Sequence, residues 1–229
     1  MSDRRAAARW MFPEGHRFAQ GAPLLLVLTF AGGLVDAASF LGLGRVFVAN
    51  MTGNVVFLGF ALSGSDQLSA PASATALAGF VAGAAAGGAW RRDTEPGRLF
   101  APLVATQGFL VALALAAQGA GLDRYAVLVP LACGMGLQNA VVHRLGVPDL
   151  TTTVVTRTLT GLAADRPGPA TVRRGASVAA LAAGALAGGL LHARTGVEGV
   201  LLAVLALLVA VVLAARRWRR VLSDGGGDG

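Results

Sequence analysis

The chain has 229 residues, of which 55% are hydrophobic and only 14% are charged. This composition is unusual for a soluble domain and typical of helices packed in a lipid bilayer. The net charge is +7, and every basic residue is an arginine, nearly always at the end of an apolar run. That placement indicates orientation in a membrane and argues against a nucleic-acid-binding protein.

Six apolar runs recur along the chain, each near the length of about 20 residues that crosses a hydrocarbon core of ~30 Å. In chain order they are 23–44, 72–90, 99–118, 125–142, 176–191 and 197–215. Arginines gather before the first run and after the last, so both termini are predicted to be cytoplasmic in a bacterial inner membrane. We expect residues 1–21 to form a cytoplasmic tail and residues 217–229 a disordered one.

The two halves of the membrane region resemble each other, which predicts an internal tandem repeat with copies at 22–120 and 121–216. Gly33-Leu34-Val35-Asp36-Ala37 is followed 103 residues later by Gly136-Leu137-Gln138-Asn139-Ala140. Small residues also recur every four positions in both halves, at Gly79, Gly83 and Gly87 and at Ala180, Gly184 and Gly188. Such spacing lets helix backbones approach closely, so these two stretches are predicted to pack against neighbours, each other included.

A polar-flecked segment follows the first helix of each half, at 46–64 and at 150–163. If both segments crossed the membrane, the fold would have eight spans and parallel repeats. If both instead dip in and return, Arg45, Arg124 and Arg194 are the arginines left outside, which fits the positive-inside rule better. We therefore predict an all-α polytopic membrane protein with about six spanning helices and two re-entrant or broken segments, in inverted halves. The eight-span fold remains an alternative.

The stretch 33–40, followed by Asn50-Met51-Thr52-Gly53-Asn54 and later by the threonine-rich run 151–156, resembles the YoaK family of bacterial membrane proteins. The resemblance extends from about residue 23 to about residue 216. Arg157 stands where the family pattern leads us to expect glycine. The resemblance implies an inner-membrane domain of unknown function, and it implies no substrate and no reaction.

Asp36 lies near the middle of the first predicted helix, where an ionisable residue is costly and suggests a functional site. Proton coupling or cation binding is one interpretation. The other is a structural aspartate that is protonated, or that is paired with an arginine or with a backbone break in the neighbouring half.

Two polar stripes complete the candidate site. Asn50 and Asn54 are one helical turn apart, as are Thr152, Thr156 and Thr160. Such stripes either line a shared cavity or form dry hydrogen bonds between helices. The predicted substrate- or ion-binding set is Asp36, Asn50, Thr52, Asn54, Gln138, Asn139, Thr153, Thr156 and Arg157.

These features predict a small-molecule or ion permease with a polar site between the repeats. A non-catalytic scaffold or sensor subunit is the alternative, and a membrane-embedded enzyme is a weaker one, because Asp36 is the only carboxylate away from the ends of the apolar runs. We expect no catalytic residues and no cofactor, and the scattered histidines and single cysteine predict no metal site. The expected partners are the lipid bilayer and an unidentified small polar or ionic substrate. A homo-oligomer is compatible with the sequence.

Overall fold

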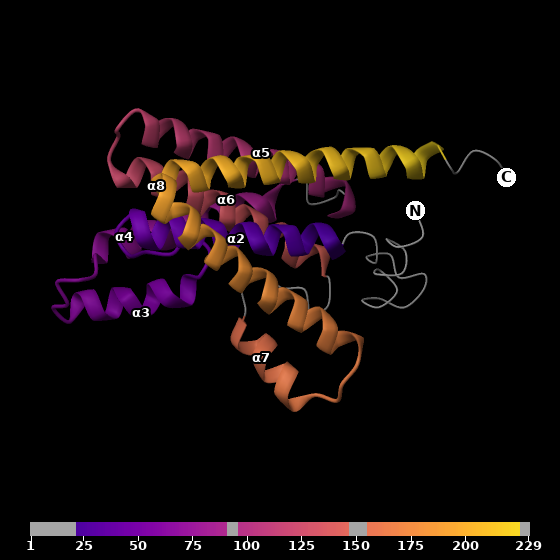
Figure 1. Cartoon of the computed structure of the whole chain (residues 1–229), viewed down its shortest axis with the longest axis horizontal. Helices are drawn as coiled ribbons and strands as arrows, with labels where there is room; N and C mark the ends of the chain where they lie inside the picture. Colours follow the sequence, from indigo (N-terminus) through magenta and orange to yellow (C-terminus); the bar gives the residue numbers. More distant parts are fainter. Residues whose placement is uncertain (1–21, 91–95, 147–154, 225–229) are drawn as a thin grey trace.

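The computed structural model describes residues 22–90, 96–146 and 155–224, and the regular structure within these ranges is entirely helical (Figure 1). Its helices are α2 (Ala22–Gly42), α3 (Met51–Leu62), α4 (Ala70–Ala89), α5 (Pro96–Gly119), α6 (Arg124–Leu145), α7 (Val155–Ala164) and α8 (Pro169–Asp224). Five of these, all but α3 and α7, are long and apolar enough to cross a membrane. The prediction of a polytopic helical membrane protein is confirmed.

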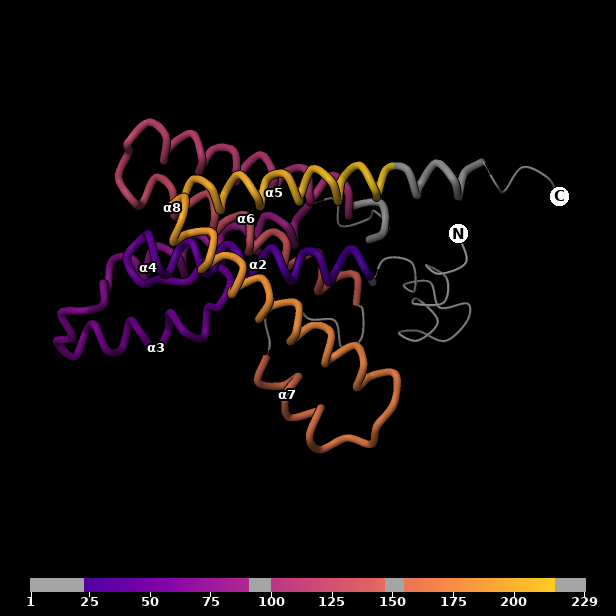
Figure 2. Tube along the Cα trace, in the orientation of Figure 1, coloured from indigo at the N-terminus to yellow at the C-terminus, as the bar shows by residue number. Residues whose placement is uncertain are grey.

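α8 consists of two helices that meet at Gly196. The backbone there has φ 67° and ψ −164°, a conformation open to glycine almost alone. The chain reverses direction at this point, and the last part of α8 runs back across the bundle (Figures 1 and 2). α8 thus supplies two of the six predicted crossings. Its helix continues to Asp224, so the segment predicted to be disordered from residue 217 begins as helix.

The first broken segment lies between α2 and α3, where the chain turns back along α2 (Figure 2). Gly44 and Arg45 make the turn, with positive φ angles of 101° and 57°. The residues that follow, Val46 to Ala49, are not helical, and Val46, Val48 and Ala49 are buried. Because hydrogen bonds from Val48 and Ala49 reach Asp36, six residues before α2 ends, the chain re-enters the bundle by about 9 Å.

α3 and α7 are too short to span a bilayer. α3 has 12 residues and α7 has 10, which correspond to about 18 and 15 Å of helix against a core of about 30 Å. Figure 1 shows α3 leading away from the interior toward the side where α4 begins. This geometry agrees with a re-entrant first segment. In the second half, residues 150–154 of the polar-flecked segment lie outside the described ranges.

The small-residue helix α4 packs against α6 at backbone contact distance. A Cβ atom at Gly83 would overlap the carbonyl group of Cys133, and one at Gly136 would overlap the carbonyl group of Phe80. One turn further along α4, a Cβ at Gly87 would lie 2.9 Å from the Cβ of Ala140. Only glycine permits this approach.

α2 and the first part of α8 form a matching pair. A Cβ at Gly184 would overlap the carbonyl group of Phe30, and one at Gly33 would overlap that of Leu181. A Cβ at Gly188 would lie 2.8 Å from the Cβ of Ala37. Each contact has its counterpart between α4 and α6. The residue in α6 comes 103 positions after the matching residue in α2, and the residue in α4 comes 101 positions before the matching residue in α8. Each small-residue helix therefore packs against the first helix of the other half.

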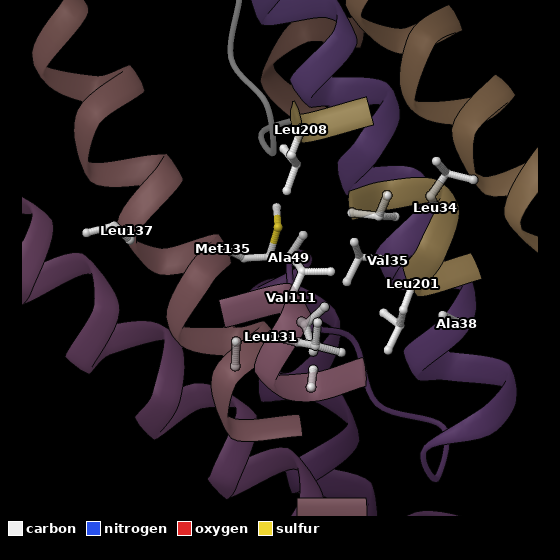
Figure 3. Packing of buried hydrophobic residues seen from close by; sticks show 14 of the residues in the cluster. Leu34, Val35, Ala38, Ala49, Val111, Leu131, Met135, Leu137, Leu201 and Leu208 are labelled. Carbon is white, nitrogen blue, oxygen red and sulfur yellow. The ribbon is translucent and has the colours of Figure 1, made fainter. Parts of the chain in front are cut away.

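The core lies where α2, α5, α6 and the last part of α8 meet. Figure 3 shows the side chains of Val35, Val111, Met135 and Leu208 gathered in this region, with Ala49 of the broken segment beside them. All five are buried. The broken segment is therefore part of the protein interior, where its backbone polar groups need partners from the chain itself.

Candidate functional site

Asp36 supplies partners for the backbone of the broken segment. Its Oδ1 atom accepts hydrogen bonds from the N–H groups of Val48 at 3.0 Å and Ala49 at 2.7 Å. The side chain is 9% exposed, and Ser39 donates to the Asp36 carbonyl oxygen at 3.2 Å. Asp36 thus binds a backbone break, as expected for a structural aspartate. The break belongs to its own half, however, and not to the neighbouring one.

Asn54, in the first turn of α3, holds the same segment from the other side. Its Oδ1 accepts from the N–H of Phe47 at 2.9 Å, and its Nδ2 donates to the Phe47 carbonyl oxygen at 2.6 Å. The carboxamide therefore satisfies both backbone groups of one residue, as a neighbouring strand would. Asn54 is fully buried. Its role depends on having both a donor and an acceptor.

Asn50 caps the N-terminus of α3. Its Oδ1 accepts from the N–H of Gly53 at 3.4 Å. Asn50 and Thr52 are both exposed, whereas Asn54 is not. The predicted stripe therefore divides into a buried clamp at Asn54 and an exposed helix start.

Aromatic packing fixes the broken segment against both neighbouring helices. The Phe47 ring stacks on Phe40 of α2 at 4.9 Å between centroids and on Phe57 of α3 at 5.6 Å. Gly53 makes room for this ring, since a Cβ there would lie 2.8 Å from it. Together with Asp36 and Asn54, these contacts hold an irregular backbone at membrane depth.

The counterparts in the second half are arranged differently. Asn139 of α6 donates from Nδ2 to the Met135 carbonyl oxygen at 2.9 Å and has further interactions. Gln138, next to it, is fully buried, and neither its Oε1 nor its Nε2 has a hydrogen-bond partner. Thr153 lies outside the described residues. Thr156 and Arg157 are exposed on α7, and the Thr156 carbonyl oxygen accepts from the Thr160 hydroxyl at 3.0 Å.

The structure brings part of the predicted set together and leaves part of it apart. Asp36, Asn50 and Asn54 surround one broken segment. α3 packs against α4, whereas α7 packs against α8, and Figure 1 shows α3 at the left and α7 apart from it at the lower edge. Thr156 and Arg157 therefore do not share a local site with Asn50, Thr52 and Asn54.

Among the buried polar residues that the sequence analysis did not single out, Gln107 has most of its hydrogen-bonding capacity unused. Gln107 of α5 is 1% exposed, and its Nε2 lies 3.5 Å from the Met135 sulfur, while its Oε1 has no partner. It follows Thr106 within the apolar run 99–118 and belongs to no motif. The only signal available was a carboxamide in the middle of a predicted membrane helix.

Within the described ranges, no group of three or more histidine, cysteine, aspartate or glutamate side chains is arranged to hold a metal ion. The buried charged residues there are Asp36 and Arg173. The site that remains is a set of carboxamides and one carboxylate around a discontinuous element. Its groups can donate and accept hydrogen bonds.

Fold and site together define a multi-pass helical membrane protein with a discontinuous, hydrogen-bonded element inside its bundle. The chain belongs to the DUF1275 family of proteins of unknown function, whose model matches residues 24–214. It is also similar to the UPF0700 transmembrane protein YoaK of Bacillus subtilis (strain 168), with 34% identity over 152 residues that cover 63% of this chain and 67% of that protein. No solved structure matches it. The resemblance inferred from the sequence motifs is confirmed.

Proposed function

We propose that this protein is a permease for a small molecule or an ion, built from two inverted halves with a polar site between them. The observation that carries the proposal is the discontinuous element of residues 46–54, held at the depth of Asp36 by side-chain hydrogen bonds. Non-helical backbone at membrane depth is tolerated where it is buried in protein or lines a water-filled path. Secondary transporters place such broken helices at their binding sites.

The helix pairs support an inverted arrangement of the halves. The reciprocal glycine contacts of α2 with α8 and of α4 with α6 are what a two-fold relation between the halves produces. Gly32 lies close to the proposed two-fold axis. A Cβ atom there would be 3.6 Å from Met135, which is the residue that corresponds to Gly32 in the second half, 103 positions later. Rocking of one half against the other about a midplane site is a common transport mechanism for such folds.

The location we propose is the bacterial inner membrane, with both termini in the cytoplasm. α2 begins and α8 ends on one side of the bundle (Figure 1). The turn at Gly44 and Arg45 lies at the other side with the α5–α6 connection, since a Cβ atom at Gly44 would be 2.7 Å from the Arg124 guanidinium group. The few arginines at that second side support its being the outside.

A scaffold or sensor subunit is the second candidate, and one observation favours it. Asp36, Asn50 and Asn54 all bind backbone groups of their own segment. Polar side chains used in this way stabilise a fold and need no solute. We propose a non-enzymatic role in either case, since Asp36 is the one buried carboxylate among the described residues.

Flux measurements on reconstituted protein separate these candidates. Proteoliposomes and protein-free liposomes are compared for uptake of neutral solutes by light scattering and for ion conduction with a potential-sensitive dye. If the protein is a permease, at least one class of solute or ion is expected to cross the membrane of the proteoliposomes faster than that of the protein-free liposomes. Where that flux depends on pH, Asp36→Asn is expected to remove the dependence, because an amide does not titrate. Equal flux in both preparations for every solute and ion contradicts the permease and supports the scaffold.

A further inference from the structure

Two buried glutamines lie at the junction of the two halves. Gln107 belongs to α5, the last helix of the first half, and Gln138 belongs to α6, the first helix of the second. Their exposed fractions are 1% and 0%. Neither takes part in the hydrogen bonds that hold the broken segment.

Both side chains are on the flank where α5 meets α6. The Cγ atom of Gln107 lies 3.5 Å from the position that a Cβ of Gly134 would occupy, and its Nε2 lies 3.5 Å from the Met135 sulfur. Gln138 is four residues after Gly134 and three after Met135, so it shares their face of the helix. Both residues therefore face the α5–α6 interface, about one helical turn apart along α6.

Most of the hydrogen-bonding capacity of this pair is unused within the protein. Oε1 of Gln107 and both Oε1 and Nε2 of Gln138 have no partner. The one contact of Gln107 is with a thioether, which is a weak acceptor. Buried polar side chains in native proteins are nearly always satisfied, by protein groups or by an ordered molecule such as water. This pair offers two acceptor oxygens and an amide donor to such a molecule.

The surroundings of the two glutamines disfavour a charged solute. Leu103, Val104 and Leu110 on the same helix are apolar, and the first two are buried. A charged solute in apolar surroundings needs a counter-charge. Of the two buried charged residues in the described ranges, Asp36 already binds Val48 and Ala49 through its Oδ1, and Arg173 lies in the first part of α8, near the α7 end of the molecule.

We propose that Gln107 and Gln138 bind the substrate of this protein and that the substrate is a small uncharged solute with both donor and acceptor groups, such as an amide or a polyol. The word substrate in this assignment rests on the proposed transport function, whereas binding of the solute is inferred from the two glutamines alone. The position between α5 and α6 lets a solute contact both halves at once. Solute binding there is thus coupled to their relative movement.

Leucine variants test the assignment with a matched control. Gln107→Leu and Gln138→Leu keep a side chain of similar size and remove the hydrogen-bonding groups, while Gln118→Leu makes the same change in a half-buried residue of α5 outside the interface pair. Thermal unfolding in detergent is measured with glycerol, urea and acetamide at non-denaturing concentrations, and uptake of each is measured in proteoliposomes. Ligands that bind the folded state raise its unfolding temperature.

We expect at least one of the three probes to raise the unfolding temperature of the wild type and of Gln118→Leu and to leave both interface variants unchanged. Without probe, the interface variants should unfold at the same or a higher temperature, because an unpaired buried amide is replaced by an apolar group. Uptake of that probe should fall at least about tenfold in both.

The outcomes separate the binding assignment from the transport function. Probe-induced stabilisation or uptake that persists in both interface variants overturns the assignment. So does ion conduction without uptake or binding of any neutral probe. Stabilisation that depends on the glutamines, in the absence of any flux, supports the binding site and overturns transport. A loss of folded protein in one variant is resolved by the other, since each removes one half of the pair.

Discussion

At the scale of single residues, Asp36 and Asn54 hold the same backbone segment by different means. Asp36 offers an acceptor to two N–H groups, and Asn54 pairs with both polar groups of Phe47. The substitutions that each position tolerates follow from this difference. Buried N–H groups left without partners cost about 1–3 kcal/mol each.

The acceptor at Asp36 can be kept or removed. Asp36→Asn retains an Oδ1 atom for Val48 and Ala49, whereas Asp36→Leu leaves both N–H groups unpaired. We expect the free energy of unfolding of Asp36→Asn to lie within about 1 kcal/mol of the wild-type value and that of Asp36→Leu to fall by about 2–6 kcal/mol, from two unpaired groups. Chemical unfolding in detergent measures both. Equal stability of Asp36→Leu and the wild type would show that the segment does not depend on this carboxylate.

At Asn54 the donor is essential as well. Asn54→Asp keeps the acceptor for the Phe47 N–H but loses the donor to its carbonyl oxygen, and it places a charge in the interior. Asn50→Asp is the matched control, because Asn50 only accepts a hydrogen bond at a helix start, where aspartate serves equally well. We expect Asn54→Asp to lower the unfolding temperature in detergent clearly and Asn50→Asp to leave it unchanged. Similar effects of the two substitutions contradict the clamp.

At the scale of helices, the close packing of α4 on α6 depends on particular glycines. Gly83→Ala would drive a methyl group into the Cys133 carbonyl, whereas Gly88→Ala meets nothing within 4 Å. Overpacking of this kind costs about 1–3 kcal/mol. In an exposed helix position, alanine is better than glycine by up to about 1 kcal/mol. We therefore expect opposite signs in unfolding experiments. A neutral Gly83→Ala would mean that α4 and α6 are further apart.

The sequence predicted the helices better than their partners. Long apolar runs determine where a chain can cross a membrane, and the described residues have five helices long and apolar enough, of which α8 has two parts that meet at Gly196. The short α3 lies inside the first polar-flecked segment. Small-residue spacing showed that α4 and α8 pack closely, yet it names no neighbour, and each proved to pair with the first helix of the other half. Asp36 was identified as a costly buried residue, but its partners Val48 and Ala49 depend on a turn that no local pattern specifies. Gln107 was missed because its burial depends on packing against α6, which its own stretch of sequence does not specify.

The re-entrant path of the first broken segment can be tested from outside the membrane. With Cys133 replaced, single cysteines at Arg45 and Ser65 are expected to react with an impermeant thiol reagent added to the same side of the bilayer. Leu122→Cys, exposed in the α5–α6 connection, should label with them, and Arg166→Cys, exposed between α7 and α8, should label only from the opposite side. Labelling of Arg45 and Ser65 from different sides requires a full crossing and restores the eight-span fold.

At the scale of the whole molecule, each half is packed mainly by the other. α2 lies on α8 and α4 lies on α6, so the tightest helix contacts all join residues before the α5–α6 connection to residues after it. A half expressed alone would expose glycine-lined helix faces shaped for close backbone contact. Van der Waals packing of this kind is a main source of helix association in lipid. The halves are therefore expected to be unstable separately and to assemble when both are present.

Splitting the chain in the α5–α6 connection, between Gly121 and Leu122, tests this dependence without removing any helix. The two fragments, one of them tagged, are produced alone and together in membranes, and their amount and co-purification are measured. We expect co-production to yield a stable complex and each fragment alone to be degraded or aggregated. Gly83→Leu in the first fragment should prevent assembly, because its side chain would collide with Cys133 of the second, whereas Gly88→Leu should permit it. A first fragment that is stable by itself, or assembly that survives Gly83→Leu, contradicts the reciprocal packing on which the two-half architecture rests.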